Sequence, residues 1–567
     1  MKKTKRQNKS EPAPAKPRHW WQLWWVWAVI LGALFAVYQI YEPALNGGFV
    51  FDDRYLPFFD PNVSGKFWTF VGNLRPLLMI SFWIDYHRAG GADPHAFHST
   101  NILLHFCTSI LISLIVLRIV EWANVQGRMR VALALFSGGL FLLHPLQTES
   151  VAYVASRSEV LSALFYFAAF ALFVWRPDSM TRGRELIRVL AILLLFVAAA
   201  GTKEDTLTLP VLMVLTDLYW HRGLRRNSIL YATLGVTAIA GAVYVLRILR
   251  SSNSAGFRFG GVTPLNYFFT ESRVLWTYLR LIILPAGQNV DPDVAISHGA
   301  FDHGAIVFLL ALVALAVAAW MYRQRAPLAA FGFFAFLLLI APTSSIVPIK
   351  DVLAEHRLYI PFLGLTLIAC DLLRRSAFPQ AVTIAGIALI VCSAVTYQRA
   401  EVWSGPLALW RDTIEKSPDK YRPRFQLAYA NFEQNHCAEA VKDYQIASKL
   451  APVDDELLVD WALALDCDNQ HNAALDKLHQ AAAMNNTPHV HTQIAVVYAK
   501  RQRYEQARAE LMQALQLDPI NNLAISYLGS VEEAEHRCPE ARADYQRALQ
   551  LNPNNQLASA GLQRPCQ

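Results

Sequence analysis

Two adjacent carboxylates, Asp52 and Asp53, follow the first long apolar segment of the chain, in the run GGFVFDDRYLPFFDPNV. Two negative charges held side by side disfavour each other's ionised form, which suits a general base and equally suits a metal site. A solvated turn is the alternative to both roles. This acidic pair is the first candidate for chemistry.

Other ionisable side chains border apolar segments, where a charge is costly and tends to have a role. In a first group, Arg75 in NLRPLLMISFWIDY precedes His98, Asn101 and His105 in HSTNILLH. Offsets of three and seven residues place the last three on one face of a helix. His105 lies deeper in its apolar segment, and we interpret it as a core histidine with satisfied hydrogen bonds.

A second group surrounds a turn between two apolar segments, in the run LLHPLQTESVAYVASRSE. Its members are His144, Glu149, Arg157 and Glu159. For some of them, helix capping is the alternative to a role in binding.

A third group joins the 203–205 turn, Lys-Glu-Asp, to the run PIKDVLAEHRLYIP. Its members are Lys203, Glu204, Asp205, Lys350, Asp351, Glu355, His356, Arg357 and Tyr359. Cations at the mouth of a lipid-facing cavity are what the phosphate of an anionic lipid requires. Anchoring at the membrane interface is the alternative interpretation of these residues.

Carboxylates and a cationic group on one side of a membrane predict transfer of a group from a phosphorylated lipid. Other chemistries lack their motifs. The chain has no G-x-S-x-G run of serine hydrolases, no phosphate-binding P-loop and no Cys/His spacing typical of zinc. It also lacks a basic groove interleaved with exposed aromatic residues, so we expect no nucleic-acid partner.

The elements that hold these residues are predicted to be membrane helices. Of the 567 residues 54% are hydrophobic and only 17% are charged, against about a quarter charged in soluble domains. Long apolar runs recur up to residue 398 and then stop. Eleven spanning helices are predicted, at about 20–40, 102–120, 131–147, 158–175, 186–201, 204–220, 228–248, 303–321, 328–348, 357–373 and 380–398.

Arginines in the short connections predict the orientation. Eleven spans with a cytoplasmic N-terminus place every such group on the cytoplasmic side, as the positive-inside rule requires. These groups are Arg128 and Arg130, then Arg176, Arg182, Arg184 and Arg188, then Arg222, Arg225 and Arg226, then Arg323 and Arg325, and finally Arg374 and Arg375. The apolar run 265–284 is then predicted to lie on, or dip into, the outer face. Residues 46–100, 203–205 and 348–356 and the C-terminal part share that outer side.

The predicted domains are a cytoplasmic basic tail (1–19), a membrane domain (20–399) whose first external loop is 42–100, and a soluble domain (400–567). In the last, the interval from Pro418 to Pro452 and that from Pro519 to Pro553 match the period of the tetratricopeptide repeat (TPR), about 34 residues. The interval from Pro452 to Pro519 is close to two such periods. About four repeats are predicted, with a concave surface suited to an extended peptide. Partner binding is the plain interpretation of such repeats.

Four of the seven cysteines, Cys437, Cys467, Cys538 and Cys566, lie in the repeats. The members of the pairs 437–467 and 538–566 are about one repeat apart, and an oxidising compartment would permit these two bridges. Free thiols in the core are the alternative. Cys107, Cys370 and Cys392 lie in apolar spans and are predicted to be packing residues.

The runs FVFDDRYLPFFDPNV, LRPLLMISFWIDY, FHSTNILLHF, FLLHPLQTESVAYVASRSEVLSALF, GTKEDTLTLPVLMVLTDLY and AEHRLYIPFLGL stand in this order before the repeats. Together they resemble the transmembrane and TPR-containing O-mannosyltransferases and their bacterial relatives in the GT-C superfamily. The resemblance covers nearly the whole chain. It implies an all-α fold of about eleven spans followed by a TPR solenoid, a polyprenyl-phosphate-sugar donor, a protein hydroxyl acceptor and a catalytic acid in the first external loop. The family's Ala-Glu-Arg-type motif departs here, because His356 stands between Glu355 and Arg357.

The mechanism expected from this resemblance is a single displacement with inversion. Asp53, or else Asp52, takes the acceptor proton as general base. Donor phosphate is expected to bind at Arg357, Lys203, Lys350 and His356. Acceptor or sugar hydroxyls are expected to bind at Glu149, Arg157, Glu159, Arg75 and His98. No cofactor is predicted to be required, and a divalent metal is the open alternative.

The expected setting is the bacterial inner membrane, with the N-terminus cytoplasmic and the repeats in the periplasm. Partners are then the lipid bilayer, a polyprenyl-phosphate sugar such as one of mannose or another hexose, and an acceptor protein or peptide held by the repeats. A non-enzymatic, membrane-anchored TPR scaffold is the alternative function. A transporter is disfavoured because the two halves contain no inverted repeat of interrupted helices.

Overall fold

The computed structural model describes residues 24–59, 66–72, 75–177, 179–250, 256 and 262–565. Within these ranges the chain forms helices joined by short connections, and it contains no β-strand. The predicted all-α class is confirmed. The predicted basic tail, 1–19, lies outside the described residues.

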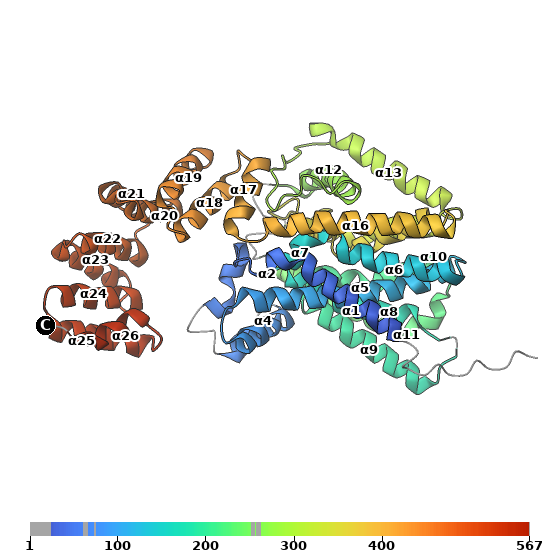
Figure 1. Cartoon of the computed structure of the whole chain (residues 1–567), viewed down its shortest axis with the longest axis horizontal. Coiled ribbons are helices and arrows are strands. Elements are labelled where there is room, and N and C mark those ends of the chain that lie inside the picture. The colour runs from blue at the N-terminus through green and yellow to red at the C-terminus, as the bar shows by residue number, and fades with distance from the viewer. Residues whose placement is uncertain are drawn as a thin grey trace, which may run out of the picture.

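A bundle of long helices, here called the membrane body, forms the larger part of the molecule (Figure 1). Its long and medium helices are α1 (Trp24–Ile40), α5 (Pro94–Trp122), α6 (Gly127–Leu143), α8 (Arg157–Val174), α9 (Arg182–Ala200), α10 (Leu209–Tyr219), α11 (Ser228–Leu249), α12 (Pro264–Ile283), α13 (Ala305–Tyr322), α14 (Pro327–Ile340), α15 (Phe362–Leu373) and α16 (Phe378–Val402). Many run side by side along one axis, and the buried core lies between them. α5 packs against both α6 and α8.

Five of these helices are long and apolar enough to cross a membrane within the described residues: α5, α8, α13, α16 and the stretch Leu224–Arg247 that contains most of α11. A sixth span results if α6 and the bent segment after it, Pro145–Ala152, are counted together. Shorter apolar helices lie at Trp27–Ile40, Pro327–Ile340 and Phe362–Leu373. The total of eleven spans stays a prediction. α12, the ambiguous run, is not among these candidate spans.

The short helices α14 and α15 approach each other closely through two glycines. A Cβ added to Gly332 would collide with the Gly364 carbonyl oxygen, and one added to Gly364 would collide with that of Gly332. Small residues permit such backbone contact between helices in lipid. This packing fixes the start of α15, which directly follows the His356 region.

The end of the membrane body that faces the repeats contains the first external loop and several short helices (Figure 1). These are α2 (Glu42–Leu45), η2 (Phe51–Tyr55), η3 (Pro57–Phe59), α3 (Phe67–Val71), α4 (Pro76–Ala89), η4 (Pro145–Gln147), α7 (Thr148–Ala152), η5 (Glu204–Thr208) and η8 (Glu355–Leu358). A separate apolar cluster that includes Phe58, Phe70, Phe82 and Phe97 gives the loop a core of its own. The loop is therefore a packed layer over the bundle.

Helix pairs stacked in an arc follow α16 and form the repeat array (Figure 1). The helices are α17 (Pro406–Lys416), α18 (Tyr421–Glu433), α19 (Cys437–Leu450), α20 (Asp455–Cys467), α21 (His471–Met484), α22 (Pro488–Lys500), α23 (Tyr504–Leu517), α24 (Asn522–Ala534), α25 (Cys538–Leu551) and α26 (Gln556–Gln563). Each pair from α18–α19 to α24–α25 packs closely within itself. About four repeats were predicted, and four such pairs are present.

Local signals explain where these helices begin and end. α17, α19, α23 and α25 each end two residues before one of the four recurring prolines, because proline disfavours helical geometry in the residue before it. The first helices of successive repeats begin with a capping side chain, at Asp454, Thr487 and Asn521, and Asn555 caps α26 in the same way. Each cap accepts a hydrogen bond from the backbone N–H three residues later, which satisfies one of the unpaired donors of the first turn.

A disulfide joins Cys437 at the start of α19 to Cys467 at the end of α20, with a Cα–Cα distance of 5.6 Å. This predicted bridge is confirmed. The other predicted bridge includes Cys566, which lies outside the described residues. Cys107, Cys370 and Cys392 are free thiols, and Cys370 is buried.

Candidate active site

One cavity of about 780 Å³ lies where the membrane body meets the repeat array. It is lined by residues from all the predicted groups: Asp52, Arg75, Glu149, Glu159, Lys203, Lys350, Asp351, His356 and Arg357. Segments that are far apart in the sequence thus each supply part of the wall. The sequence predicted them on one side of a membrane, and the fold brings them to one space.

The two acidic residues of the first loop have different surroundings. Asp52 is exposed and lines the cavity, and only its backbone is held, by donation from its N–H to the Tyr153 hydroxyl at 3.1 Å. Asp53 is 1% exposed. Its Oδ2 accepts a hydrogen bond from Val50 N–H at 3.0 Å and its Oδ1 accepts one from Ala155 N–H at 2.6 Å.

Asp53 therefore fastens the first loop to the turn before α8. Burial raises the pKa of Asp53 to about 8, against the opposing effect of the hydrogen bonds from Val50 and Ala155, and the carboxyl faces these backbone donors and not the cavity. The expectation that Asp53 is the general base does not fit this geometry, because a base must reach the proton that it removes. Asp52 is the member of the pair that meets the cavity.

The backbone before Asp52 is strained. Phe51 has φ +48°, in the left-handed region that a residue with a side chain seldom adopts. Its ring packs against Trp410 of the repeat array and against Tyr153, at centroid distances of 4.5 and 5.8 Å. Such strain persists only where the surroundings fix it, and here it turns Asp52 toward the cavity.

Arg357 is the cation most firmly placed in the cavity wall. Its Nη1 donates to the Val352 carbonyl at 2.9 Å and its Nη2 donates to that of Asp351, while its side chain keeps a face on the cavity. A guanidinium keeps its proton in proteins even where it is buried. Arg357 therefore presents a fixed positive charge, as phosphate binding requires.

Lys203 and Lys350 also line the cavity. Lys203 forms ion pairs with Glu159 and with Asp205, the latter at 3.4 Å, and burial lowers its pKa. Lys350 is exposed. Lys203 and Lys350 thus add basic side chains to the cavity that Arg357 also lines.

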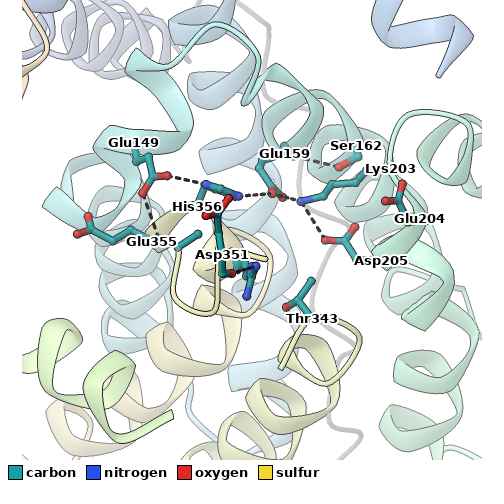
Figure 2. Close-up of polar contacts among 12 residues, drawn as sticks. Glu149, Glu159, Ser162, Lys203, Glu204, Asp205, Thr343, Asp351, Glu355 and His356 are labelled. Atoms are coloured by element: carbon teal, nitrogen blue, oxygen red, sulfur yellow. Dashed lines mark hydrogen bonds and ion pairs between the residues drawn. The ribbon is translucent and has the colours of Figure 1, made fainter. Parts of the chain in front are cut away.

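His356 lies between two carboxylates (Figure 2). Its Nδ1 is 2.6 Å from Glu149 Oε1, and its Nε2 is 3.9 Å from Glu159 Oε1. Glu149 Oε2 accepts the backbone N–H of Glu355 at 3.0 Å. Because Glu159 also meets Lys203, carboxylates alternate with nitrogen-bearing side chains across this wall. Such a row offers both donors and acceptors to the hydroxyl groups of a sugar.

Two residues expected to bind a substrate are structural. Arg157 is fully buried: its Nη2 pairs with Asp85 at 2.7 Å and donates to the Phe97 carbonyl at 2.8 Å, and its Nε donates to Asn101 Oδ1 at 2.7 Å. His98 is 3% exposed and its Nε2 is 3.1 Å from the Gly47 carbonyl oxygen. Neither side chain lines the cavity. Through these contacts Arg157 and His98 hold the first loop against the rest of the membrane body.

The remaining predictions divide in the same way. Arg75 lines the cavity and pairs with Glu204 at 2.8 Å. His105 is buried between the Tyr359 hydroxyl, at 2.7 Å, and the Leu142 carbonyl, at 3.1 Å, as its interpretation as a core residue requires. No group of three or more His, Cys, Asp or Glu side chains suited to a metal ion occurs in the part of the chain that the structure describes.

Three residues that complete the wall, Asp291, Lys420 and Arg422, were not predicted from the sequence. Glu355, a member of the third predicted group, lies behind the wall, 1% exposed, and accepts a hydrogen bond from Gln288 Nε2 at 2.6 Å. Burial raises the pKa of Glu355 to about 7. Lys420 and Arg422 lie at the start of the first repeat and look like ordinary solvated charges in the sequence. The available signal was the pair of carboxylates around a proline in NVDPDV.

The chain is similar to several known proteins. A family model described as tetratricopeptide repeat matches residues 488–521. The chain is 21% identical over 448 residues to "Protein O-mannosyl-transferase F38B6.6" of Caenorhabditis elegans, covering 73% of this chain and 61% of that one. Its relatives are TMTC-type protein O-mannosyl-transferases. To the Tmtc1 protein of Drosophila melanogaster it is 30% identical over 218 residues, covering 35% and 24%, and to human TMTC1 23% over 484 residues, covering 73% and 54%.

The chain thus spans between 24% and 61% of the length of these O-mannosyl-transferases. Among solved structures, the repeat array is similar to YrrB, described as a TPR protein with an unusual peptide-binding site, at 18% identity and a TM-score of 0.25. That likeness covers 33% of this chain and 99% of YrrB. MamA is similar at 16% identity with a TM-score of 0.24, covering 26% of this chain and 86% of MamA. With several apolar helices and these O-mannosyl-transferase relatives, the chain is an integral membrane protein with a TPR array.

Proposed function

We propose that this protein is a membrane glycosyltransferase of the GT-C type. It transfers mannose or another hexose from a polyprenyl-phosphate donor to Ser or Thr hydroxyl groups of a protein, with inversion. One observation carries the proposal: an exposed carboxylate, Asp52, shares a single cavity with the buried cation Arg357. The names of the O-mannosyl-transferase relatives support the same reaction class.

The proposed reaction is a single displacement. The Asp52 carboxylate takes the proton of the acceptor hydroxyl while the hydroxyl oxygen bonds to the anomeric carbon. The bond from that carbon to the phosphate oxygen breaks, and the lipid phosphate leaves with the electron pair. Arg357, with Lys203 and Lys350 beside it, stabilises the negative charge that grows on the phosphate. Attack opposite the leaving group inverts the anomeric configuration.

We propose that the sugar hydroxyls bind to the alternating row of His356, Glu149 and Glu159. Arg75 is proposed to contact the sugar at the rim of the cavity. Each of these side chains lines the cavity. Their mutual contacts keep them oriented before a ligand binds, which lowers the entropic cost of binding.

The proposed topology places the cavity and the repeat array on the non-cytoplasmic side, which is the periplasm for a bacterial inner membrane. The Cys437–Cys467 disulfide supports this side, because such bonds persist in oxidising compartments. A donor lipid would enter from the outer leaflet and an acceptor protein from solution.

The test is transfer by the purified, full-length protein. The protein is incubated with polyprenyl-phosphate mannose and other polyprenyl-phosphate hexoses, and added Ser/Thr peptides are analysed by mass spectrometry. Replacing Asp52 by Asn should lower turnover by about 10²–10⁴-fold, the usual contribution of a general base. Glu42→Gln is the matched control, because Glu42 is an exposed carboxylate of the same loop that does not line the cavity.

Each outcome separates the candidate functions. Transfer by the wild type that is lost in Asp52→Asn and kept in Glu42→Gln supports the proposal. Wild-type turnover in Asp52→Asn removes the general-base role. Absence of both transfer and donor binding in the wild type favours the scaffold function instead.

A further inference from the structure

One wall of the cavity belongs to the repeat array. Lys420 and Arg422, at the start of α18, both line the cavity. The Nε of Arg422 donates to Asp291 Oδ2 at 2.7 Å, and its Nη2 donates to Asp351 Oδ1 at 2.7 Å. A single guanidinium therefore bridges two carboxylates from separate segments of the membrane body. The planar fork of arginine contacts the two carboxylates through separate nitrogens in a fixed geometry, which a lysine ammonium lacks.

Asp351 links this bridge to the cation proposed to bind phosphate. The Asp351 side chain meets Arg422, while its backbone carbonyl accepts a hydrogen bond from Arg357 Nη2. The next carbonyl, that of Val352, accepts from Arg357 Nη1 at 2.9 Å. The position of the 351–352 backbone thus sets the direction of the Arg357 guanidinium, and Arg422 holds that backbone from the array.

A second set of bonds fixes the other partner of Arg422. Asp291 is 1% exposed and also pairs with Lys420 at 2.5 Å. The segment before it is clamped on both sides: Asn289 Nδ2 donates to Ser417 Oγ at 2.8 Å, and Asn289 N–H donates to Glu355 Oε1 at 2.8 Å. The array and the segment before His356 are therefore joined through one buried polar network.

We propose that Arg422 is a positioning residue of the donor site, through which the first repeat holds Arg357 where a lipid phosphate binds. This inference rests on the proposed function. It makes the repeat array a structural part of the donor site, in addition to any role in holding the acceptor. It also predicts that a residue outside the membrane body controls donor affinity.

A different role for Arg422 predicts the opposite result at Asp351. If Arg422 contacted the phosphate itself, removing the Asp351 carboxylate would free a cation, reduce negative charge beside the cavity and strengthen donor binding. If Arg422 acts through Asp351, the same change loosens Arg357 and weakens donor binding. The sign of the effect of Asp351→Ala therefore separates the two roles.

The experiment uses the full-length protein in lipid nanodiscs and two readouts. The first is the Kd for farnesyl phosphate, a short isoprenyl monophosphate, and the second is the KM of the polyprenyl-phosphate-sugar donor. Arg422→Gln and Asp351→Ala should each raise the Kd and the KM by about tenfold, the scale of one lost hydrogen bond to a charged group. The double variant should raise them by about the same factor, because the two substitutions break the same connection. The value of kcat at saturating donor should fall as well, because Arg357 is also proposed to stabilise the charge that grows on the leaving phosphate.

Arg424→Gln is the matched control. Arg424 lies on the same helix and faces Asp443 within the repeat, at 3.6 Å, so the change removes the same charge without touching the bridge. Its Kd for farnesyl phosphate should equal that of the wild type. Arg422→Lys serves as the second variant, since it keeps a cation beside Asp291 but lacks the planar fork that reaches each carboxylate through its own nitrogen. It should fold as the wild type and still weaken donor binding.

The failure of this inference is distinct from failure of the proposed function. A wild type that binds farnesyl phosphate and transfers sugar, with tighter or unchanged binding in Asp351→Ala, overturns the positioning role alone. Additive losses in the double variant do the same. A wild type that neither binds the lipid phosphate nor transfers sugar overturns the proposed function before any variant is compared.

Discussion

The membrane body and the repeat array use polar side chains over different distances in sequence. In the body, His105 meets Tyr359 across 254 residues, and Glu149 meets His356 across 207. In the array, Lys500 meets Asp466 across 34 residues, one repeat length. The body therefore needs its whole chain in place to satisfy its buried groups, whereas each repeat satisfies its own with its neighbour.

The difference indicates where function can be built. Contacts between distant segments can converge on one cavity, as those of Asp52, Glu149, Lys203 and Arg357 do. Contacts between neighbouring repeats build a regular surface that is extended by adding units. The first repeat combines both kinds, because Arg422 and Glu433 reach across to the membrane body, the latter by pairing with Arg54 at 2.7 Å.

The largest effect that would test the comparison is expected in the body. Arg157→Leu removes the buried cation that pairs with the Asp85 carboxylate and one donor to the Phe97 carbonyl. Breaking a buried ion pair from one side costs about 3–5 kcal/mol. We expect a large fall in the thermal midpoint of the detergent-solubilised protein, measured by tryptophan fluorescence, together with loss of a monodisperse peak on size-exclusion chromatography.

Arg88→Gln is the control on the same carboxylate. Arg88 meets Asp85 at 3.1 Å, but its side chain is 60% exposed, and exposed ion pairs contribute about 0–1 kcal/mol. If the thermal midpoint fell equally in Arg157→Leu and Arg88→Gln, the buried contact between distant segments would contribute no more stability than the exposed local one, and the contrast between them would fail.

Much of the array could be predicted from the sequence, because its signals are local. The prolines and the Asp, Thr and Asn caps lie within a few residues of the helix ends that they determine. The expected bridge from Cys437 to Cys467 followed from the repeat spacing alone, and it is present. The helical class of the membrane body followed from apolar runs in the same way.

The site was only half predictable. Charge patterning brought the right groups to one side, but it could not tell Asp52 from Asp53. Their difference depends on a backbone donor at Ala155, which lies far along the chain. Arg157 and Glu159 are close neighbours in sequence but have different surroundings. Arg157 is buried beneath the first loop, whereas Glu159 lines the cavity. Lys420 and Arg422 were missed because their partners lie in the other region.

The next effect concerns how the array is held together. Cys437→Ser removes the bridge that links two cysteines 30 residues apart, on α19 and α20. We expect a loss of about 3 kcal/mol in the free energy of unfolding of the array, mainly because the unfolded chain regains freedom. Denaturant unfolding with and without reductant measures it, and mass spectrometry without reduction should find the 437–467 peptide pair.

Cys392→Ser is the control for this change, since Cys392 is a free thiol on α16 in the body. The wild type and this control should lose the same stability on reduction, and Cys437→Ser should lose much less. If reductant lowered the free energy of unfolding of Cys437→Ser as much as that of the wild type, the 437–467 disulfide would not account for the stability lost on reduction.

The smallest effect is a pH dependence in the array. Burial, with Glu456 beside it, raises the pKa of Asp460 from 3.8 to about 7, against the opposing charge of Arg54 from the first loop. Between these values the folded protein binds more protons at Asp460 than the unfolded chain does. Stability from this group therefore falls as pH rises from about 4 to about 7.

Asp460→Asn cannot titrate and should flatten that part of the profile of thermal midpoint against pH. We expect about 1 kcal/mol across the window, less than full linkage because the carboxyl is partly exposed and screened. Asp476→Asn, an exposed carboxylate on α21, should keep the wild-type slope. If Asp460→Asn keeps it too, Asp460 has no raised pKa in solution. Arg54→Gln should steepen the profile of thermal midpoint against pH, because the positive charge of Arg54 lowers the pKa of Asp460. A steeper profile would show that Asp460, in the second repeat, responds to the first loop, so that contacts of the array with the membrane body extend beyond the first repeat.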